Sequence, residues 1–268
     1  MGIFDNILLA SDLDGTLYNR ARQVSEPNRA AIRRFIEEGG RFTVATGRAI
    51  QAFEQPRRAI PLNAPVILAN GALVYDYDEG RVLRSVPLDS DYLPVCAAVR
   101  AAFPEVVVEA HLLTGIWVVG SNETSRAHLA AVQVSAARAP SLTDIPGNWL
   151  KALFVGEAAM LRALSDWFRP RYGGQYDVCF SHANLLEMQH KEANKGTALC
   201  WLADALSVPP KRVFCVGDQE NDLPMLRAAV SFAPANAAPA VRAAARYAAP
   251  DCDDHALAAV IDRLPALL

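Results

Sequence analysis

The sequence contains no long hydrophobic run, no excess of basic residues and no paired cysteine motif. Nowhere do 18 apolar residues follow one another, so we expect no helix that crosses a bilayer. The opening stretch, MGIFDNILLASDLDG, carries no basic segment, and its apolar run is interrupted at Ser11 and Asp12. We therefore expect neither a secretory signal peptide nor contact with a membrane.

Charge is nearly balanced, because 26 Lys and Arg stand against 29 Asp and Glu, which gives a formal net charge of −3. A protein that coats nucleic acid or anionic lipid needs a basic surface, so we expect neither as a partner. The five cysteines include no C-x-x-C pair and leave an odd thiol. They indicate buried, small apolar side chains in a reducing compartment, hence a cytoplasmic protein. We expect the protein to be a monomer or a homodimer.

Strand and helix signals alternate in the first quarter of the chain. Short apolar runs typical of strands buried on both faces are separated by segments with helical spacing. Strands are predicted at residues 7–11, 41–45 and 66–69, and helices at 26–38 and 49–60. Such a βαβαβ opening predicts an α/β fold with a doubly wound, mostly parallel sheet and helices on both faces.

The pattern changes near residue 73 and returns to helix–strand alternation near residue 195. A hairpin at 73–86 precedes a mixed α+β stretch with helices at 91–103, 125–137 and 158–168 and five strands between and after them. We predict one core domain, residues 1–84 and 187–268, that is interrupted by an α+β cap domain at residues 85–186, a size compatible with an independent domain.

Two acidic clusters follow predicted core strands at the point where each strand ends. Asp12 and Asp14 come directly after the strand at 7–11, in Asp-Leu-Asp-Gly-Thr, and Asp218 and Asp222 follow the strand at 212–216. Ligands of open α/β sheets bind beyond the carboxyl ends of strands, so these carboxylates are expected to converge. An Asx turn or a helix cap remains an alternative interpretation for each cluster. A calcium-binding loop at the first cluster is excluded, because no glutamate occupies the last position of a twelve-residue loop.

The charge of these clusters predicts a cation. Four carboxylates with one lysine leave three excess negative charges, of which a divalent cation removes two. Hard oxygen ligands favour Mg²⁺.

Two further positions suit an anionic ligand. Thr46, Gly47 and Arg48 follow the strand at 41–45 and open a predicted helix, whose N–H groups can bind phosphate. Lys195 follows Asn194, a plausible N-cap, at a helix start where the dipole disfavours a cation, so an anion is expected nearby. The plainer readings are an N-cap threonine, a surface arginine and a solvent-exposed lysine.

Together these motifs resemble the haloacid dehalogenase-like superfamily of phosphotransferases. D-x-D-G-T-L, T-G-R, N-K-G and G-D-x-x-N-D-x-x-M-L occur in this order, each at a strand end, between residues 11 and 236. The large insert, and Asn70 with Gly71 after the third strand, are similar to the Cof-type sugar phosphatase branch. That branch has a Rossmann-like core and a type-two cap.

The resemblance implies a role for each matched residue. Asp12 would be the nucleophile that forms an aspartyl-phosphate, and Asp14 the general acid and base. The metal would be held by the Asp12 side chain, the Asp14 backbone carbonyl and Asp218, with Asp222 orienting the metal shell or Lys195. The expected phosphate ligands are Thr46, Gly47, Lys195 and Asn221, and the expected substrate is a small phosphorylated metabolite.

The cap is expected to close over the substrate and to recognise its organic part. Candidate contacts are Arg48, Asn70, His182, Asn184 and Glu187, and Trp117 could stack on a sugar, but a structural role is the plainer interpretation of the cap residues. The predicted function is that of a Mg²⁺-dependent phosphatase, with sugar phosphates as substrates. A phosphomutase or phosphotransferase on the same scaffold, or a non-catalytic sensor of a phosphometabolite, remains the alternative.

Overall fold

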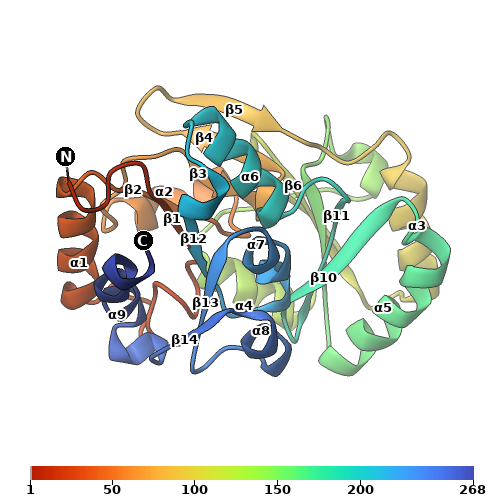
Figure 1. Ribbon diagram of the computed structural model, residues 1–268. Helices are drawn as coiled ribbons and strands as arrows, with labels where there is room; N and C mark the ends of the chain where they lie inside the picture. The colour runs from red at the N-terminus through yellow and green to blue at the C-terminus, as the bar shows by residue number, and fades with distance from the viewer. Residues whose placement is uncertain (1) are drawn as a thin grey trace.

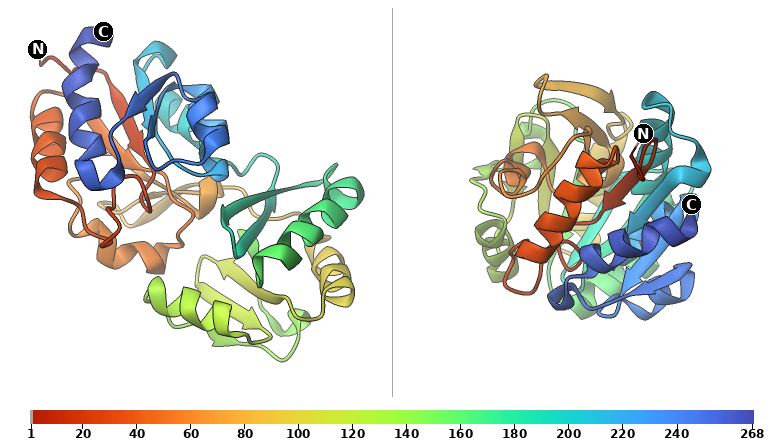
Figure 2. Two further views of the ribbon diagram at one scale, coloured as in Figure 1. Left: turned by 90° about the horizontal axis from the view of Figure 1, so that it is seen from below. Right: turned by 60° about the vertical axis from the view of Figure 1, so that its left-hand side comes forward.

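The computed structural model describes residues 2–268, which form two lobes (Figures 1 and 2). One lobe, the core, carries both termini, and the other lobe, the cap, is formed by the middle of the chain. Strands make a five-stranded sheet in the core, a six-stranded sheet in the cap and a separate three-stranded sheet. Within the described part of the chain, no helix has the length and apolar character that crossing a membrane requires.

The core elements come from both ends of the chain. The strands are β1 (Leu8–Ser11), β2 (Arg41–Val44), β3 (Val66–Leu68), β4 (Leu73–Asp76), β5 (Arg81–Ser85), β12 (Val213–Val216), β13 (Val230–Pro234) and β14 (Tyr247–Ala249). The helices are α1 (Glu26–Glu37), α2 (Ile50–Arg57), α6 (Lys195–Ala205), α7 (Leu223–Ala228), α8 (Pro239–Ala244) and α9 (Ala256–Arg263).

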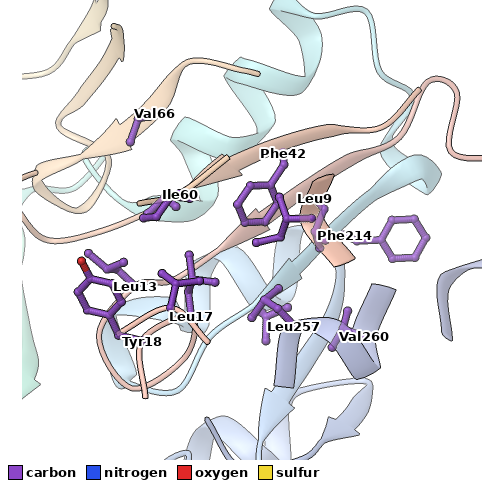
Figure 3. Close-up of a cluster of buried hydrophobic side chains, with 14 of the residues drawn as sticks. Leu9, Leu13, Leu17, Tyr18, Phe42, Ile60, Val66, Phe214, Leu257 and Val260 are labelled. Carbon is purple, nitrogen blue, oxygen red and sulfur yellow. The ribbon is translucent and has the colours of Figure 1, made fainter. Parts of the chain in front are cut away.

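The five-stranded sheet is parallel and has the order β14-β13-β12-β1-β2. Alternate side chains of its strands point to opposite faces, and both faces are apolar. On one face, Leu9, Phe42 and Phe214 pack with Leu257 and Val260 of α9 (Figure 3). Each fully buried Leu or Phe contributes about 1.5–3 kcal/mol, so this face anchors the strands whose ends carry the acidic clusters.

The opposite face of the core sheet packs against α6, α7 and α8. Leu8, Ala10 and Cys215 of the sheet meet Leu199 of α6 and Met225 of α7. The predicted doubly wound architecture is therefore present, with β1 and β12 as central neighbours. All five cysteines are free thiols; three of them are buried as expected, whereas Cys200 is exposed.

The third predicted strand joins a different sheet from the one expected. β3 pairs antiparallel with β4, and β4 with β5, while a single parallel bridge from Ala45 to Ile67 links β3 to the chain after β2. The cause is a tight reversal at Ala69, Asn70 and Gly71, all with positive φ, which returns the chain directly into β4. The hairpin of β4 and β5 was predicted correctly.

The cap elements follow one another without interruption. The strands are β6 (Val107–Leu112), β7 (Gly115–Val119), β8 (Ala137–Arg138), β9 (Lys151–Val155), β10 (Tyr176–His182) and β11 (Leu185–His190). The helices are α3 (Tyr92–Ala102), α4 (Glu123–Ala131) and α5 (Ala158–Tyr172). Helix α4 ends before the predicted residue 137, because Gln133 adopts a left-handed conformation and the chain turns into the edge strand β8.

The two faces of the cap sheet differ in chemistry. One face packs with α3 and α5 around Val108, Phe154 and Met188. The other face carries a small apolar cluster that includes Val107 and Leu153, beside buried polar residues. That second face contributes to a cavity shared with the core.

Candidate active site

Asp12 continues β1 by one residue and is held in the sheet. Its backbone N–H donates to the carbonyl oxygen of Val216 on β12 at 2.9 Å, and its side chain is buried. Leu13 and Leu17 anchor the following loop in the apolar core. The Asp12 carboxylate is therefore fixed at the carboxyl end of the central strand pair, as expected for a ligand site in an open α/β sheet.

Lys195 lies beneath this carboxylate and is fully buried. Its Nζ donates to Asp12 Oδ1 and to Asp222 Oδ1, each at 2.6 Å. Asn194 caps α6 by accepting from the backbone N–H of Thr197, which fixes the start of the helix. The alternative interpretation of Lys195 as a solvent-exposed residue is therefore wrong. The anionic groups expected near it are the carboxylates of Asp12 and Asp222.

The second acidic cluster meets the first. Carboxylate oxygens of Asp12, Asp218 and Asp222 lie within 4.8 Å of one another. Asp218 Oδ1 accepts from the Thr16 hydroxyl at 2.8 Å, and Asp222 Oδ2 accepts from the backbone N–H of Asp218 at 2.8 Å. Both oxygens of Asp222 are thus occupied by protein donors, which makes it the positioning member of the cluster.

Burial and mutual repulsion act on these carboxylates. Burial raises the pKa of Asp12, the carboxylates of Asp222 and Asp218 raise it further, and Lys195 opposes both effects. Burial and Asp222 raise the pKa of Asp218 to about 6. Burial lowers the pKa of Lys195, but Asp12 and Asp222 outweigh it, so its pKa lies above the ordinary value and the lysine stays charged.

The excess charge is smaller than the sequence predicts. Asp14 lies outside the cluster, because Arg48 donates to both of its carboxylate oxygens, from Nε at 2.8 Å and from Nη2 at 2.7 Å. Three carboxylates against the Lys195 ammonium leave two excess negative charges instead of three. Arg48 has a side chain only 9% exposed, so its reading as a surface charge is wrong.

The Thr46–Arg48 segment is a loop and not the start of a helix. Helix α2 begins at Ile50, because the Thr46 hydroxyl accepts from the backbone N–H of Arg48 at 3.2 Å and closes a local turn. The Asn70 backbone N–H donates to the Thr46 carbonyl oxygen at 3.0 Å. The loop is therefore fixed beside the reversal that follows β3.

Two amides lie at the same edge with unused groups. Asn221 Nδ2 donates to Asn70 Oδ1 at 3.0 Å. The Asn221 oxygen and the Asn70 nitrogen are buried without a hydrogen-bond partner. Buried polar atoms of this kind are costly unless a ligand or water satisfies them, so both amides are poised to contact a bound group.

The cap contributes a buried ion pair between Glu187, a predicted candidate contact, and Lys151, which the sequence analysis did not single out. The Lys151 ammonium on β9 donates to Glu187 of β11 and, at 2.6 Å, to the Gly47 carbonyl oxygen of the core. Lys151 and Glu187 are 1% and 3% exposed. A lysine beginning an otherwise apolar strand was the available signal, but the sequence does not show which face of the cap sheet meets the core.

Core and cap together enclose a cavity of about 380 Å³. Nine of the predicted site residues border it: from the core Asp12, Asp14, Thr46, Gly47, Arg48 and Asn221, and from the cap His182, Asn184 and Glu187. His182 and Asn184 lie at the β10–β11 turn, where Asn184 Nδ2 donates to the Gly156 carbonyl oxygen at 2.9 Å. Trp117 is absent from this lining and packs against the apolar cap core, so stacking on a ligand in this cavity is not its role.

Comparisons with known proteins agree on one family. The sequence profile of haloacid dehalogenase-like hydrolases matches residues 9–261. The 5-amino-6-(5-phospho-D-ribitylamino)uracil phosphatase YcsE of Bacillus subtilis (strain 168) is 26% identical over 243 residues, which cover 90% of this chain and 88% of the relative. The HMP-PP phosphatase of Enterobacter sp. (strain 638) is 28% identical over 222 residues, covering 82% and 80%.

Solved structures share the complete fold. A haloacid dehalogenase-like hydrolase from B. subtilis has a TM-score of 0.84 at 25% identity and covers 96% of this chain and 99% of its own. The sugar phosphatase BT4131, of subclass IIB, has a TM-score of 0.84 at 18% identity and covers 98% and 100%. The parallel core sheet with an inserted mixed-sheet cap is the subclass IIB architecture.

Proposed function

Because this chain belongs to the haloacid dehalogenase-like hydrolase family and is a phosphoric monoester hydrolase, we propose that it hydrolyses small phosphorylated metabolites, foremost sugar phosphates, through an aspartyl-phosphate intermediate. One observation carries the proposal. The Asp12 carboxylate is fixed at a strand end, bonded through Oδ1 to a buried lysine, and borders the same cavity as Asp14. This arrangement suits a nucleophile with a general acid beside it.

The first half of the reaction uses both aspartates of the β1 loop. A carboxylate oxygen of Asp12 attacks phosphorus, the bond between phosphorus and the leaving oxygen breaks, and Asp14 donates a proton to that oxygen. Lys195 and the Thr46 hydroxyl donate to the charged phosphoryl oxygens, and Asn221 contributes its side-chain amide nitrogen, which has a second N–H beside the one that it donates to Asn70 Oδ1. Asp14 must exchange a proton during this step, which weakens its ion pair with Arg48.

The second half regenerates the enzyme. Asp14, now ionised, removes a proton from water, and the water oxygen attacks phosphorus and breaks its bond to Asp12. Inorganic phosphate leaves and both carboxylates return to their first state. Exclusion of bulk water until the leaving group has gone is the task of the closed cap, which contacts the core through Lys151 and the Gly47 carbonyl oxygen.

The buried carboxylates fit magnesium. Three aspartates offer hard oxygen ligands, and only one lysine balances their negative charge. Burial and the nearby Asp222 carboxylate raise the pKa of Asp218, so a bound cation would stabilise its ionised form. Asp12 and Asp218 would hold the ion together with the Asp14 backbone carbonyl. When bound, Mg²⁺ supplies electrostatic stabilisation to the charged phosphoryl group.

The function is tested by phosphate release from a panel of phosphomonoesters that includes sugar, polyol, flavin-precursor and pyridoxal phosphates. We expect turnover of several members, with sugar phosphates among the best, because family members with this cap act on small metabolites. A requirement for a bisphosphate activator would instead identify a phosphomutase. Tight binding without release of phosphate would identify a sensor.

Removal of the metal should abolish activity and lower stability. We expect EDTA to reduce phosphate release at least on the order of a hundredfold. Saturating Mg²⁺ should raise the midpoint of thermal unfolding by about 5 °C, because it binds the native carboxylate cluster and relieves its repulsion. Calorimetry with and without Mg²⁺ checks the second result, and an enzyme indifferent to EDTA would contradict the metal assignment.

Gly15 provides a sharper test of the metal ligands. Its φ is +84°, and a Cβ atom there would lie 2.6 Å from Asp218 Oδ2. Gly15→Ala should therefore displace Asp218 and raise the Mg²⁺ concentration needed for half-maximal activity by about tenfold or more. Gly80→Ala is the matched control, since Gly80 also has a positive φ, +65°, but open space around it. Equal Mg²⁺ requirements in the two variants would refute Asp218 as a ligand.

We further propose that the enzyme acts on free metabolites in the cytoplasm, as a monomer or homodimer. Five free thiols support a reducing compartment. The near-balanced charge supports a small-molecule substrate over a nucleic acid. We propose that core and cap are two folding units, divided close to the predicted core residues 1–84 and 187–268 and cap residues 85–186; the strands shift the boundaries slightly, because β5 keeps Ser85 in the core and β11 extends the cap to His190.

A further inference from the structure

A histidine of the cap faces the cavity without a partner. His111 lies on β6 opposite Lys151 of β9, and directly opposed residues share one face of a sheet. The imidazole is 4% exposed, borders the cavity, and has no hydrogen-bond partner at Nδ1 or at Nε2 among the described residues. An unsatisfied buried ring of this kind is costly to the fold, which points to a ligand that completes it.

The imidazole of His111 is neutral. Burial lowers its pKa well below the ordinary value, and the charges of Lys151 and His128 lower it further. A neutral imidazole has one N–H donor and one acceptor nitrogen. A ligand group that satisfies both nitrogens must therefore supply an acceptor as well as a donor.

A second histidine stands beside the first with one nitrogen committed. His128 Nδ1 lies 3.0 Å from Glu109 Oε2, and Glu109 Oε1 accepts from the Ser125 hydroxyl at 2.7 Å. Glu109 is fully buried, so this chain of contacts fixes the ring of His128. Since His128 also borders the cavity, its remaining nitrogen adds to the polar groups available there.

Among the described residues, the charged cap side chains Lys151 and His128 that border the cavity are paired with carboxylates. Lys151 pairs with Glu187, and His128 pairs with Glu109. Two core arginines also border the cavity: Arg48 pairs with Asp14, whereas the exposed Arg22 donates to the uncharged Ala131 carbonyl oxygen and keeps its positive charge. The other cap side chains around the cavity are mostly small or apolar, including Ile116, Ala127, Val132 and Leu153. The cap side chains around His111 therefore present mainly uncharged groups to the cavity.

We propose that His111 is a specificity-determining residue that hydrogen-bonds uncharged hydroxyl groups of the leaving group. A hydroxyl can donate as well as accept, so two hydroxyls of a sugar or polyol can pair with the two nitrogens of a neutral imidazole, whereas phosphate and carboxylate oxygens only accept and leave one nitrogen unpaired. The enzyme thus prefers monophosphates of neutral sugars or polyols to esters whose leaving group lacks hydroxyls. This inference rests on the proposed phosphatase function.

The test compares two substrates in three variants. In His111→Leu, kcat/KM for ribose 5-phosphate or sorbitol 6-phosphate, whichever the wild type prefers, falls about tenfold to a hundredfold. Turnover of p-nitrophenyl phosphate, whose leaving group has no further hydroxyl, stays within about twofold. His111→Gln, which keeps one donor and one acceptor, recovers part of the loss. His190→Leu, on β11 outside the cavity lining, changes neither substrate.

Stability separates specificity from folding. His111→Leu removes an unsatisfied buried polar group, so its unfolding midpoint in urea is equal to or above that of the wild type. An equal loss on both substrates, or no loss on either, would overturn the role of His111. A wild type that hydrolyses no phosphomonoester, p-nitrophenyl phosphate included, would overturn the proposed function as well. If the wild type hydrolyses p-nitrophenyl phosphate but His111→Leu does not change the preference between the two substrates, only the specificity role of His111 is overturned.

Discussion

Asp12→Asn should abolish phosphate release while leaving the fold in place. An amide oxygen is a poor nucleophile and cannot form the aspartyl-phosphate, so turnover should fall on the order of 10⁴-fold or more. Asparagine has nearly the same shape, and Lys195 keeps its contact with Asp222. Because the substitution also removes one of two excess buried negative charges, the metal-free variant should be at least as stable as the wild type.

Phosphate release and urea unfolding without metal are the two measurements for this variant. Asp166→Asn is the matched control, because Asp166 is exposed on α5 and has no part in the site. It should leave both quantities unchanged. Activity of Asp12→Asn close to the wild-type value would remove Asp12 as the nucleophile, and a large loss of stability would mean that its charge supports the fold.

Lys195→Met should lower stability, in contrast to Asp12→Asn, and should lower activity as Asp12→Asn does. The variant keeps the apolar stem but leaves Asp12 and Asp222 facing each other without a countercharge. Removing one partner of a buried ionic network destabilises by about 3–5 kcal/mol. Phosphate binding and turnover should also fall severely, since the proposed phosphate ligand is lost.

Protonation and metal binding provide the signature of this mechanism. The deficit of Lys195→Met should shrink as pH falls, because protonating the unpaired aspartates removes their repulsion, and Mg²⁺ should restore part of it. Lys211→Met, at an exposed position, serves as the control for losing a lysine. The measurement is the denaturant midpoint of the variant and of the wild type across pH. A loss of stability that does not depend on pH would show that lost packing, and not unpaired charge, destabilises the variant.

Strand ends made much of this site predictable. Asp12 and Asp218 each follow a short apolar run, and the rule that ligands gather at the carboxyl ends of parallel strands brings them together. β1 and β12 are indeed neighbours. The helix cap at Asn194 was also predicted correctly, because capping depends on a side chain and a backbone N–H that lie three residues apart.

Other features depend on contacts that no local pattern contains. A lysine at a helix start reads as a surface residue until the tertiary structure places two carboxylates against it, and the pairing of Arg48 with Asp14 is equally non-local. Strand β14 was missed because Tyr-Ala-Ala lacks the β-branched residues that favour strands. Lys151 and His111 were missed because alternation along a strand does not show which face of the cap sheet meets the core.

The arrangement of strands has a consequence for how the protein is made. The central pair of the core sheet joins β1 to β12, and the Thr16–Asp218 hydrogen bond links residues 202 positions apart. Every strand of the cap sheet, by contrast, comes from the continuous stretch 107–190. A growing chain on the ribosome can therefore complete the cap while β1 still waits for its partner, since non-local pairings form last. The proposed active site is complete only after β12, in the final quarter of the chain, has been synthesised. We therefore expect that no amino-terminal fragment that ends before β12 hydrolyses phosphate esters.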